Sequence, residues 1–190
     1  TAIKNLLFNS DGTRIFIADA LRRLVQYDLG TAYSPSTTSN VKSKTLSMTG
    51  IPGANGEEQL ADMAFNDDGS RLCMLTRPQG DGDLENAVVE YRLGTAYDIS
   101  GSVTYVRSFL VESEVVPAPN DPVFARSLSW AGDGFGLYVS DAGDNRTYSF
   151  STGVPSFPES NDNDGTLAQS TNRFIITGDT FKDTDNDNIL

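Results

Sequence analysis

The sequence contains no histidine and one cysteine among its 190 residues. Histidine is the commonest general base and transition-metal ligand, so its absence excludes a Ser-His-Asp or Cys-His catalytic site. A lone cysteine excludes a disulfide within the chain. Cys73 lies between Leu72 and Met74 in an apolar run, and this position predicts a buried, unreactive thiol.

Long hydrophobic runs and positive charge are also scarce. No stretch approaches the ~20 apolar residues that span a bilayer, and no signal peptide is visible. The 14 Lys and Arg residues stand against 26 Asp and Glu residues, which gives a net charge of −12. This charge disfavours duplex nucleic acid and anionic membranes as partners. Apolar residues make up 38% of the chain, a fraction typical of one ordinary globular domain.

One motif occurs twice and, in degraded form, a third time: Phe-x-x-Asp-Gly, a short apolar run, then Tyr-x-Leu-Gly-Thr-Ala-Tyr. The copies begin at Phe8, Phe65 and Trp130, and their second halves begin at Tyr27, Tyr91 and Tyr148. Self-similarity at about 50–60 residues is typical of stacked small β-sheets in which no unit buries its faces alone. We divide this single domain, 1–190, into repeat one (2–48), repeat two (60–111), repeat three (125–178) and an acidic tail (179–190).

Each repeat predicts four strands. The first strands are expected at 5–8, 62–65 and 127–130, the second at 14–17, 71–75 and 136–139, the third from 25, 89 and 147, and the fourth at 41–48, 103–111 and 173–177. Apolar residues fall two apart in the first and third strands, which is the strand period. The Asp-Gly pair after each first strand predicts a two-residue type I′ hairpin turn, which needs positive φ at both positions.

Apolar stripes with helical spacing are nearly absent, so we predict an all-β fold, a β-propeller-like array of about three four-stranded antiparallel blades. Propellers usually close with about four to eight blades, and an array of three leaves sheet faces uncovered. Copies of the chain could complete a ring, neighbouring subunits could cover the faces, or the sequence could be a fragment. All three alternatives predict that the chain is not a stable monomer.

The segments Phe-Asn-x-Asp-Gly-[Ser/Thr]-Arg, Tyr-x-Leu-Gly-Thr-Ala-Tyr and Asp98-Ile99-Ser100 resemble a propeller-like repeat. That repeat belongs to virion structural and tail proteins of marine and cyanobacterial phages and to large secreted proteins of aquatic bacteria. The likeness covers most of 2–111 and is weaker over 125–178. It implies an extracellular or virion-borne building and attachment module, and it implies no catalytic residues.

Two acidic clusters are candidate Ca²⁺ sites. Asp183, Asp185 and Asp187 stand at alternate positions, as do the first ligands of a Ca²⁺ loop. Asn replaces the Gly of that motif and the acid at position 12 is missing, so a frayed acidic tail is the competing interpretation. Asp162 and Asp164 form a second oxygen-rich cluster, for which a solvated turn is the alternative.

Other polar and aromatic positions have structural interpretations. Asp19 and Asp141 each follow a second strand and are expected to bond the backbone of the next turn rather than to form a carboxylate pair. Tyr33 and Tyr97 are expected to pack the corner between third and fourth strands, with a sugar-stacking platform as the alternative. Trp130 aligns with the phenylalanines of the other repeats, so we expect it in the core.

We therefore expect a non-enzymatic structural or attachment protein that assembles through its blades, with a phage virion as its setting. Its expected partners are other copies of itself or neighbouring virion proteins, and its expected location is extracellular or in the virion. The alternative is a Ca²⁺-dependent, lectin-like carbohydrate-binding module of a secreted protein, with surface glycans as partners. A propeller enzyme of the lactonase or hydrolase type is disfavoured, because Asp62 is the one central acid that the predicted first strands offer. No cofactor other than Ca²⁺ is expected.

Overall fold

The structure is a computed structural model that describes residues 2–48, 59–77, 86–111, 124–131, 136–142, 146–151 and 175–176. These residues form three four-stranded antiparallel sheets, with the strand orders β1-β2-β3-β4, β5-β6-β7-β8 and β12-β11-β10-β9. Each sheet corresponds to one sequence repeat, with the strands in chain order. The prediction of an all-β array of three four-stranded blades is confirmed.

Most strands begin or end a few residues beyond the predicted bounds, whereas β4 ends at Thr45 rather than at 48, and β12 is described only for Ile175–Ile176. Blade 1 contains β1 (Ile3–Phe8), β2 (Arg14–Asp19), β3 (Arg23–Leu29) and β4 (Thr38–Thr45), with a one-turn 3-10 helix η1 (Pro35–Thr37) before β4. Blade 2 contains β5 (Gln59–Phe65), β6 (Arg71–Arg77), β7 (Ala87–Thr95) and β8 (Asp98–Leu110). Blade 3 contains β9 (Ala125–Trp130), β10 (Gly136–Asp141), β11 (Arg146–Ser151) and β12 (Ile175–Ile176). In blades 1 and 2 the fourth strand begins earlier than predicted, because Thr38 and Asp98 already pair with the third strand.

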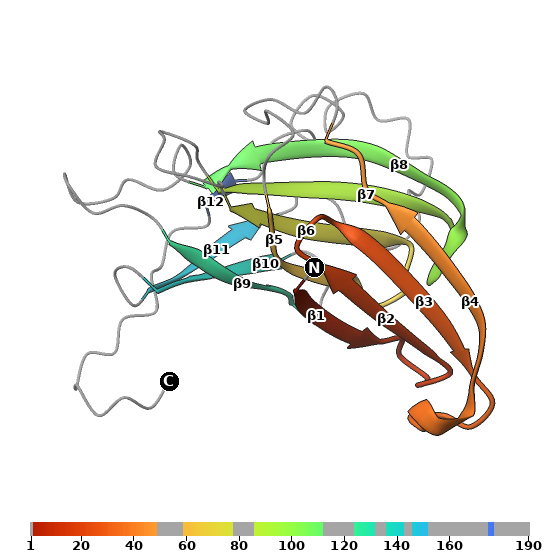
Figure 1. The fold of residues 1–190 in the computed structure, drawn as a ribbon. Helices are drawn as coiled ribbons and strands as arrows, with labels where there is room; N and C mark the ends of the chain where they lie inside the picture. Colours follow the sequence, from red (N-terminus) through yellow and green to blue (C-terminus); the bar gives the residue numbers. More distant parts are fainter. Residues whose placement is uncertain are drawn as a thin grey trace, which may run out of the picture.

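The three blades follow one another with their first strands on the inside (Figure 1). β5 lies between β1 and β9 and contacts both, while β4 and β8 meet on the outer side. The polar sequences of the outer strands fit this position, because charged side chains discourage pairing at a sheet edge.

Each blade has two faces, because side chains alternate along a strand. We call the face that packs on the preceding blade the leading face, and the opposite one the trailing face. We call the contact between two adjacent blades a seam. In the first seam, the trailing face of blade 1 packs against the leading face of blade 2. The side chains in contact are Phe16, Ala18 and Leu24 of blade 1 and Met63, Leu72, Met74, Val89 and Tyr91 of blade 2. In the second seam, Cys73, Leu75 and Val88 pack against Leu128, Leu137, Val139, Tyr148 and Phe150.

Strand pairing corrects the alignment of the third repeat. Leu72 of blade 2 pairs with Tyr91, but the equivalent Leu137 of blade 3 pairs with Phe150 and not with Tyr148. A shift of two residues leaves the same side chains on the same face. Phe150 therefore occupies the buried position that a tyrosine takes in blade 2.

The Asp-Gly hairpin is not the predicted two-residue type I′ turn. In blade 1 the Asn9 N–H donates to the Arg14 carbonyl at 3.1 Å, which closes a four-residue loop. Within the Asp-Gly pair, Gly12 alone has a positive φ, 70°. The Asp11 carboxylate accepts a hydrogen bond from the Thr13 N–H at 2.9 Å, a side-chain-to-backbone contact that stabilises the longer loop.

The tyrosine at the end of the first and of the second motif covers this turn. A Cβ on Gly12 would lie 2.4 Å from the Tyr33 ring, and one on Gly69 would lie 2.2 Å from the Tyr97 ring. The Tyr97 hydroxyl also donates to the Asp67 carbonyl at 2.8 Å. The glycine is therefore required twice, for its φ and for the space above it. The expectation that these tyrosines pack the corner is confirmed.

Candidate functional site

The sequence-predicted Ca²⁺ ligands lie outside the described residues: Asp162, Asp164, Asp183, Asp185 and Asp187. Within the part of the chain that the structure describes, no group of three His, Cys, Asp or Glu side chains could hold a metal ion. In that same part, no helix is long and apolar enough to cross a membrane. The Ca²⁺ ligands therefore remain predictions.

Asp62, the one central acid expected on the first strands, links three blades. Its Oδ1 accepts hydrogen bonds from the Asn5 side chain of β1 and from the Met63 N–H, and its Oδ2 accepts from the Leu128 N–H of β9 at 2.8 Å. Burial raises the pKa of this carboxyl above its usual value, although the three donors act in the opposite direction. The contacts of Asp62 hold the inner strands together.

Asp19 and Asp141 each contact the backbone of their own blade. The Leu21 and Arg23 N–H groups donate to Asp19 Oδ1 at 2.9 and 3.0 Å, as predicted for the turn after β2. Asp141 accepts from the Phe124 N–H at 2.8 Å, just before β9, while residues 143–145 of the turn for which its contact was predicted lie outside the described residues. Both carboxylates thus cap backbone groups.

Blade 2 contains a buried charge cluster on its trailing face. The Glu90 carboxylate is fully buried and accepts hydrogen bonds from Arg71 Nη1 and, at 2.6 Å, from Arg107 Nε. Cys73 pairs with Glu90 across β6 and β7 and is also fully buried. The prediction of a buried thiol is confirmed, and burial raises the pKa of this thiol well above the usual value, which favours the unreactive protonated form.

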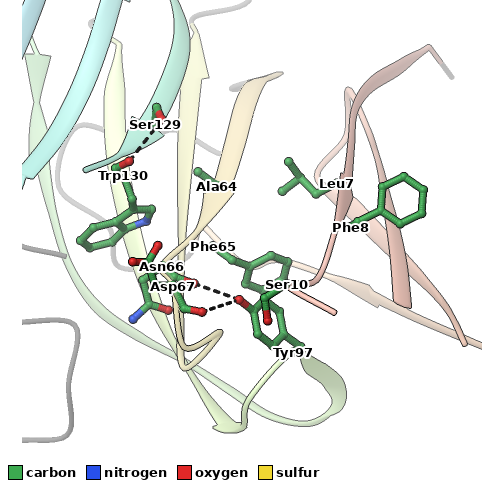
Figure 2. A pocket seen from close by; sticks show the side chains of 10 residues that line it. All are labelled: Leu7, Phe8, Ser10, Ala64, Phe65, Asn66, Asp67, Tyr97, Ser129 and Trp130. Carbon is green, nitrogen blue, oxygen red and sulfur yellow. Dashed lines mark hydrogen bonds between the residues drawn. The ribbon is translucent and has the colours of Figure 1, made fainter. Parts of the chain in front are cut away.

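A groove of about 450 Å³ crosses the ends of the three inner strands (Figure 2). Its lining comes from all three blades: Leu7, Phe8, Ser10, Ala64, Phe65, Asn66, Asp67, Tyr97, Ser129 and Trp130. Trp130 was expected in the core, and it does pack against the apolar cluster of the second seam while also lining this groove. Its indole Nε1 is buried and has no hydrogen-bond partner among the described residues. Aromatic walls with a few polar groups are typical of small-ligand sites.

The sequence reasoning missed this groove. Ser10, Asn66 and Ser129 come from different repeats, and no local pattern joins them. The available signal was the alignment of the repeats on Phe8, Phe65 and Trp130, which places the neighbours of these residues at the same end of three adjacent strands.

The leading face of blade 1 is apolar, and no blade formed by the described residues covers it, in contrast to its counterparts in blades 2 and 3. Leu6 pairs with Ile17 and Ile17 with Val25, while Phe8 pairs with Ile15 and Ile15 with Tyr27. Paired residues share a face of the sheet, so this face comprises Leu6, Phe8, Ile15, Ile17, Val25, Tyr27 and Leu29. Leu6 is 52% exposed, whereas the equivalent Met63 and Leu128 are 1% and 6% exposed.

No family model matches the chain, and no curated protein matches it. It is similar to the solved structure of a putative 6-phosphogluconolactonase from Bacteroides fragilis, with 14% identity, a TM-score of 0.55 and coverage of 95% of this chain and 39% of that one. It is also similar to the periplasmic gluconolactonase of Pseudomonas aeruginosa (15% identity, TM-score 0.57, coverage 94% and 39%) and to the β-propeller domain of Cps50 (Swd1) from Myceliophteria thermophila (12%, 0.50, 78% and 40%).

These neighbours overturn the expectation that the chain is not an enzyme. Two of the three are described as lactonases, so the blade architecture on which that expectation rested is shared with catalysts. The chain spans about two fifths of the length of these structures, and at such low identity the likeness shows the fold alone. The described residues form a three-blade array with a β-propeller-like fold.

Proposed function

We propose that the chain is a structural and attachment module that assembles with neighbouring proteins through its blade faces, as a component of a phage virion. The observation that carries this proposal is the apolar leading face of blade 1. Leu6 on that face is 52% exposed, while the equivalent Met63 in blade 2 is 1% exposed. A contiguous apolar sheet face of this kind marks a protein interaction site.

The resemblance of the repeats to those of phage virion proteins supports the virion as the setting. The partners in this proposal are other copies of the chain or neighbouring virion proteins. The net charge of −12 favours protein rather than nucleic acid as the surface contacted, because a negative field repels phosphate groups.

Two measurements test this proposal together. An antibody raised against the recombinant chain is used on gradient-purified phage particles, and the chain is expected to sediment with capsid or tail components. Sedimentation of the chain released from particles is expected to show it in complexes heavier than 20.5 kDa. A chain that is absent from particles and stays a folded monomer at micromolar concentration would contradict the proposal.

The groove favours a second candidate, a Ca²⁺-dependent carbohydrate-binding module. The rings of Phe65, Tyr97 and Trp130 offer flat apolar surfaces, and Asp67 adds a polar group beside them. Binding on a glycan array is expected to be lost in Trp130→Ala and in the presence of a chelator. Phe124→Ala is the matched control, because Phe124 is a 47% exposed aromatic outside the groove lining. Equal binding by both variants would exclude the groove as the sugar site.

A further inference from the structure

We propose that the leading face of blade 1 docks a further propeller blade, one that the described residues of this chain do not supply. The trailing face of that blade carries an apolar centre and an arginine at the start of its second strand. This inference rests on the proposed assembly function and names the partner of the same surface.

The leading face of blade 1 carries the same kinds of side chain as the leading face of blade 2, which packs against another blade. Five register-matched positions are apolar in blades 1 and 2: Leu6 and Met63, Ile15 and Leu72, Ile17 and Met74, Val25 and Val89, and Tyr27 and Tyr91. In blade 2 all five side chains are at most 2% exposed, because blade 1 covers them. In blade 1 Ile15 is only 4% exposed, whereas Leu6 is 52% exposed, so the part of this face around Leu6 fits a covering blade better than it fits water.

The two seams show what covers such a face. The trailing faces of blades 1 and 2 each place an apolar pair at the centre, Ala18 with Leu24 and Leu75 with Val88, and each begins its second strand with an arginine, Arg14 and Arg71. These features are common to both covering faces although the other residues differ. They define the chemistry expected of the partner blade.

In the first seam the arginine has acceptors on the neighbouring blade, whereas Arg71 of blade 2 binds Glu90 of its own blade. Arg14 Nη1 donates to the Tyr97 carbonyl at 2.7 Å and to the Ala96 carbonyl at 3.3 Å, both at the corner of blade 2. In blade 1 Tyr33 has a similar backbone conformation, with a φ of 57° against 53° for Tyr97, although the 3-10 helix η1 follows it. The proposal takes the carbonyls of Ala32 and Tyr33 as the acceptors for the arginine of a docked blade.

A second copy of this chain does not offer such a face. The trailing faces of its blades 1 and 2 are already used in the seams, which leaves that of blade 3. There Ser140 and Thr147 pair in the places of Ala18 and Leu24, with their hydroxyl oxygens 3.2 Å apart. Burying these hydroxyl groups against an apolar sheet removes their water without supplying new partners.

The alkylation rate of a cysteine placed on the leading face of blade 1 measures whether another blade covers that face. Leu6→Cys introduces this thiol, and the native Cys73 does not interfere because it is fully buried. Leu21→Cys is the matched control, because Leu21 is 55% exposed and lies in the turn between β2 and β3, away from the face. The measurement is the rate of alkylation by iodoacetamide.

The partner is supplied as an added blade. A second copy of residues 2–48 is placed ahead of the full chain and joined through residues 49–58, so that its trailing face meets the leading face of the original. Alkylation of the Leu6→Cys thiol is expected to slow by about tenfold or more, as for a group that reacts only after local opening. The Leu21→Cys rate should stay unchanged, and Phe16→Asp in the added copy should abolish the protection.

A second added blade keeps the test decisive. Residues 59–111 with Cys73→Ala, joined through 112–123, replace the first copy if circular dichroism shows that it does not fold. A thiol that reacts at the full rate with both added blades overturns the proposal. Protection of Leu6→Cys in the chain without an added blade, together with a dimer mass, identifies a second copy as the occupant; this overturns the choice of partner and leaves the assembly function standing. Absence of the chain from virions removes the function without changing the protection.

Discussion

The two seams of the molecule bury similar aromatic pairs. Phe16 and Phe65 meet in the first seam and Phe109 and Phe150 in the second, with ring centroids 4.7 Å apart in each case. Their ring planes are inclined by 56° and 50°, which is the tilted geometry that aromatic pairs prefer. The apolar parts of the two seams are therefore expected to contribute alike.

The seams differ at one polar position, which is Gln26 in blade 1 and Glu90 in blade 2. The Gln26 side-chain oxygen accepts from the Ile99 N–H at 3.0 Å and so connects two blades. Glu90 is held by Arg71 and Arg107 of its own blade. A buried carboxylate has a large desolvation cost that its cations must offset, whereas an amide has a small one. The buried Gln26 of the first seam thus connects two blades, whereas the buried Glu90 of the second seam connects side chains within blade 2.

Removal of the Glu90 carboxylate tests this difference most strongly. Glu90→Ala should lower the free energy of unfolding by about 4 kcal/mol, because it leaves two buried guanidinium groups without a counter-charge. Urea denaturation followed by circular dichroism measures the loss. Glu90→Gln retains acceptor capacity and should lose less. A loss for Glu90→Ala no larger than that for Gln26→Leu would refute the distinction.

The aromatic pairs should show that the apolar parts are equivalent. Phe16→Ala and Phe150→Ala each remove a fully buried ring and should each cost about 3 kcal/mol, from lost burial and the cavity left behind. Phe8→Ala, on the partly exposed leading face, is the control and should cost clearly less. Losses for the two buried rings that differ by a factor of two would show that the seams are unequal.

Gln26→Leu should act on the first seam alone. It removes the acceptor of the buried Ile99 N–H, with an expected cost of about 1.5 kcal/mol. Hydrogen exchange followed by mass spectrometry should show faster exchange around Ile99. Glu90→Gln is the control and should leave that exchange unchanged; acceleration by both variants would mean that the contact is not specific to one seam.

The pH dependence of stability should have opposite signs at two carboxylates of the first seam. Burial raises the folded-state pKa of Asp62 above 3.8, so its contribution is fully present below 3.8 and is lost as pH rises through the folded pKa. The hydrogen bond from the Ser100 hydroxyl, aided by Lys42, lowers the pKa of Asp98 to about 2, so its contribution is present above 3.8 and is lost as pH falls toward 2.

Stability curves of Asp62→Asn and Asp98→Asn, each subtracted from that of the parent chain between pH 2 and 7, measure these contributions. The two difference curves should slope in opposite directions. Parallel slopes would contradict the environments described for the two side chains.

The strand order could be predicted because its signals are local and repeated. Apolar alternation near Phe8, Phe65 and Trp130 defines the inner strand of each blade, and three independent copies remove most of the ambiguity of a short apolar run. The turn type could not be predicted, because the pair Asp11-Gly12 fits both a two-residue hairpin and the longer loop that forms. The difference depends on the ring of Tyr33, which lies far along the chain.

The site was less predictable than the fold. The motif alignment paired Tyr148 with the earlier tyrosines, but the hairpin register places Phe150 there, and a register is set by the whole connection between strands. The groove draws Leu7, Ala64 and Ser129 from three repeats, so it exists only once the blades are stacked. The expectation of no enzyme failed for another reason, since a fold does not determine chemistry.

Because the tyrosine ring contacts the turn glycine, these two residues of a repeat must be replaced together when sequences are recombined between related repeats. Because Tyr97 occupies the space where a Cβ on Gly69 would stand, an alanine at the glycine requires a smaller residue at the tyrosine. The third repeat has Gly153 and Val154 in place of Ala-Tyr, and both these residues and its Asp-Gly turn lie outside the described part of the chain. In a library of shuffled repeats, variants that inherit glycine and tyrosine from the same parent should fold, whereas hybrids that combine a bulky turn residue with the tyrosine should be eliminated.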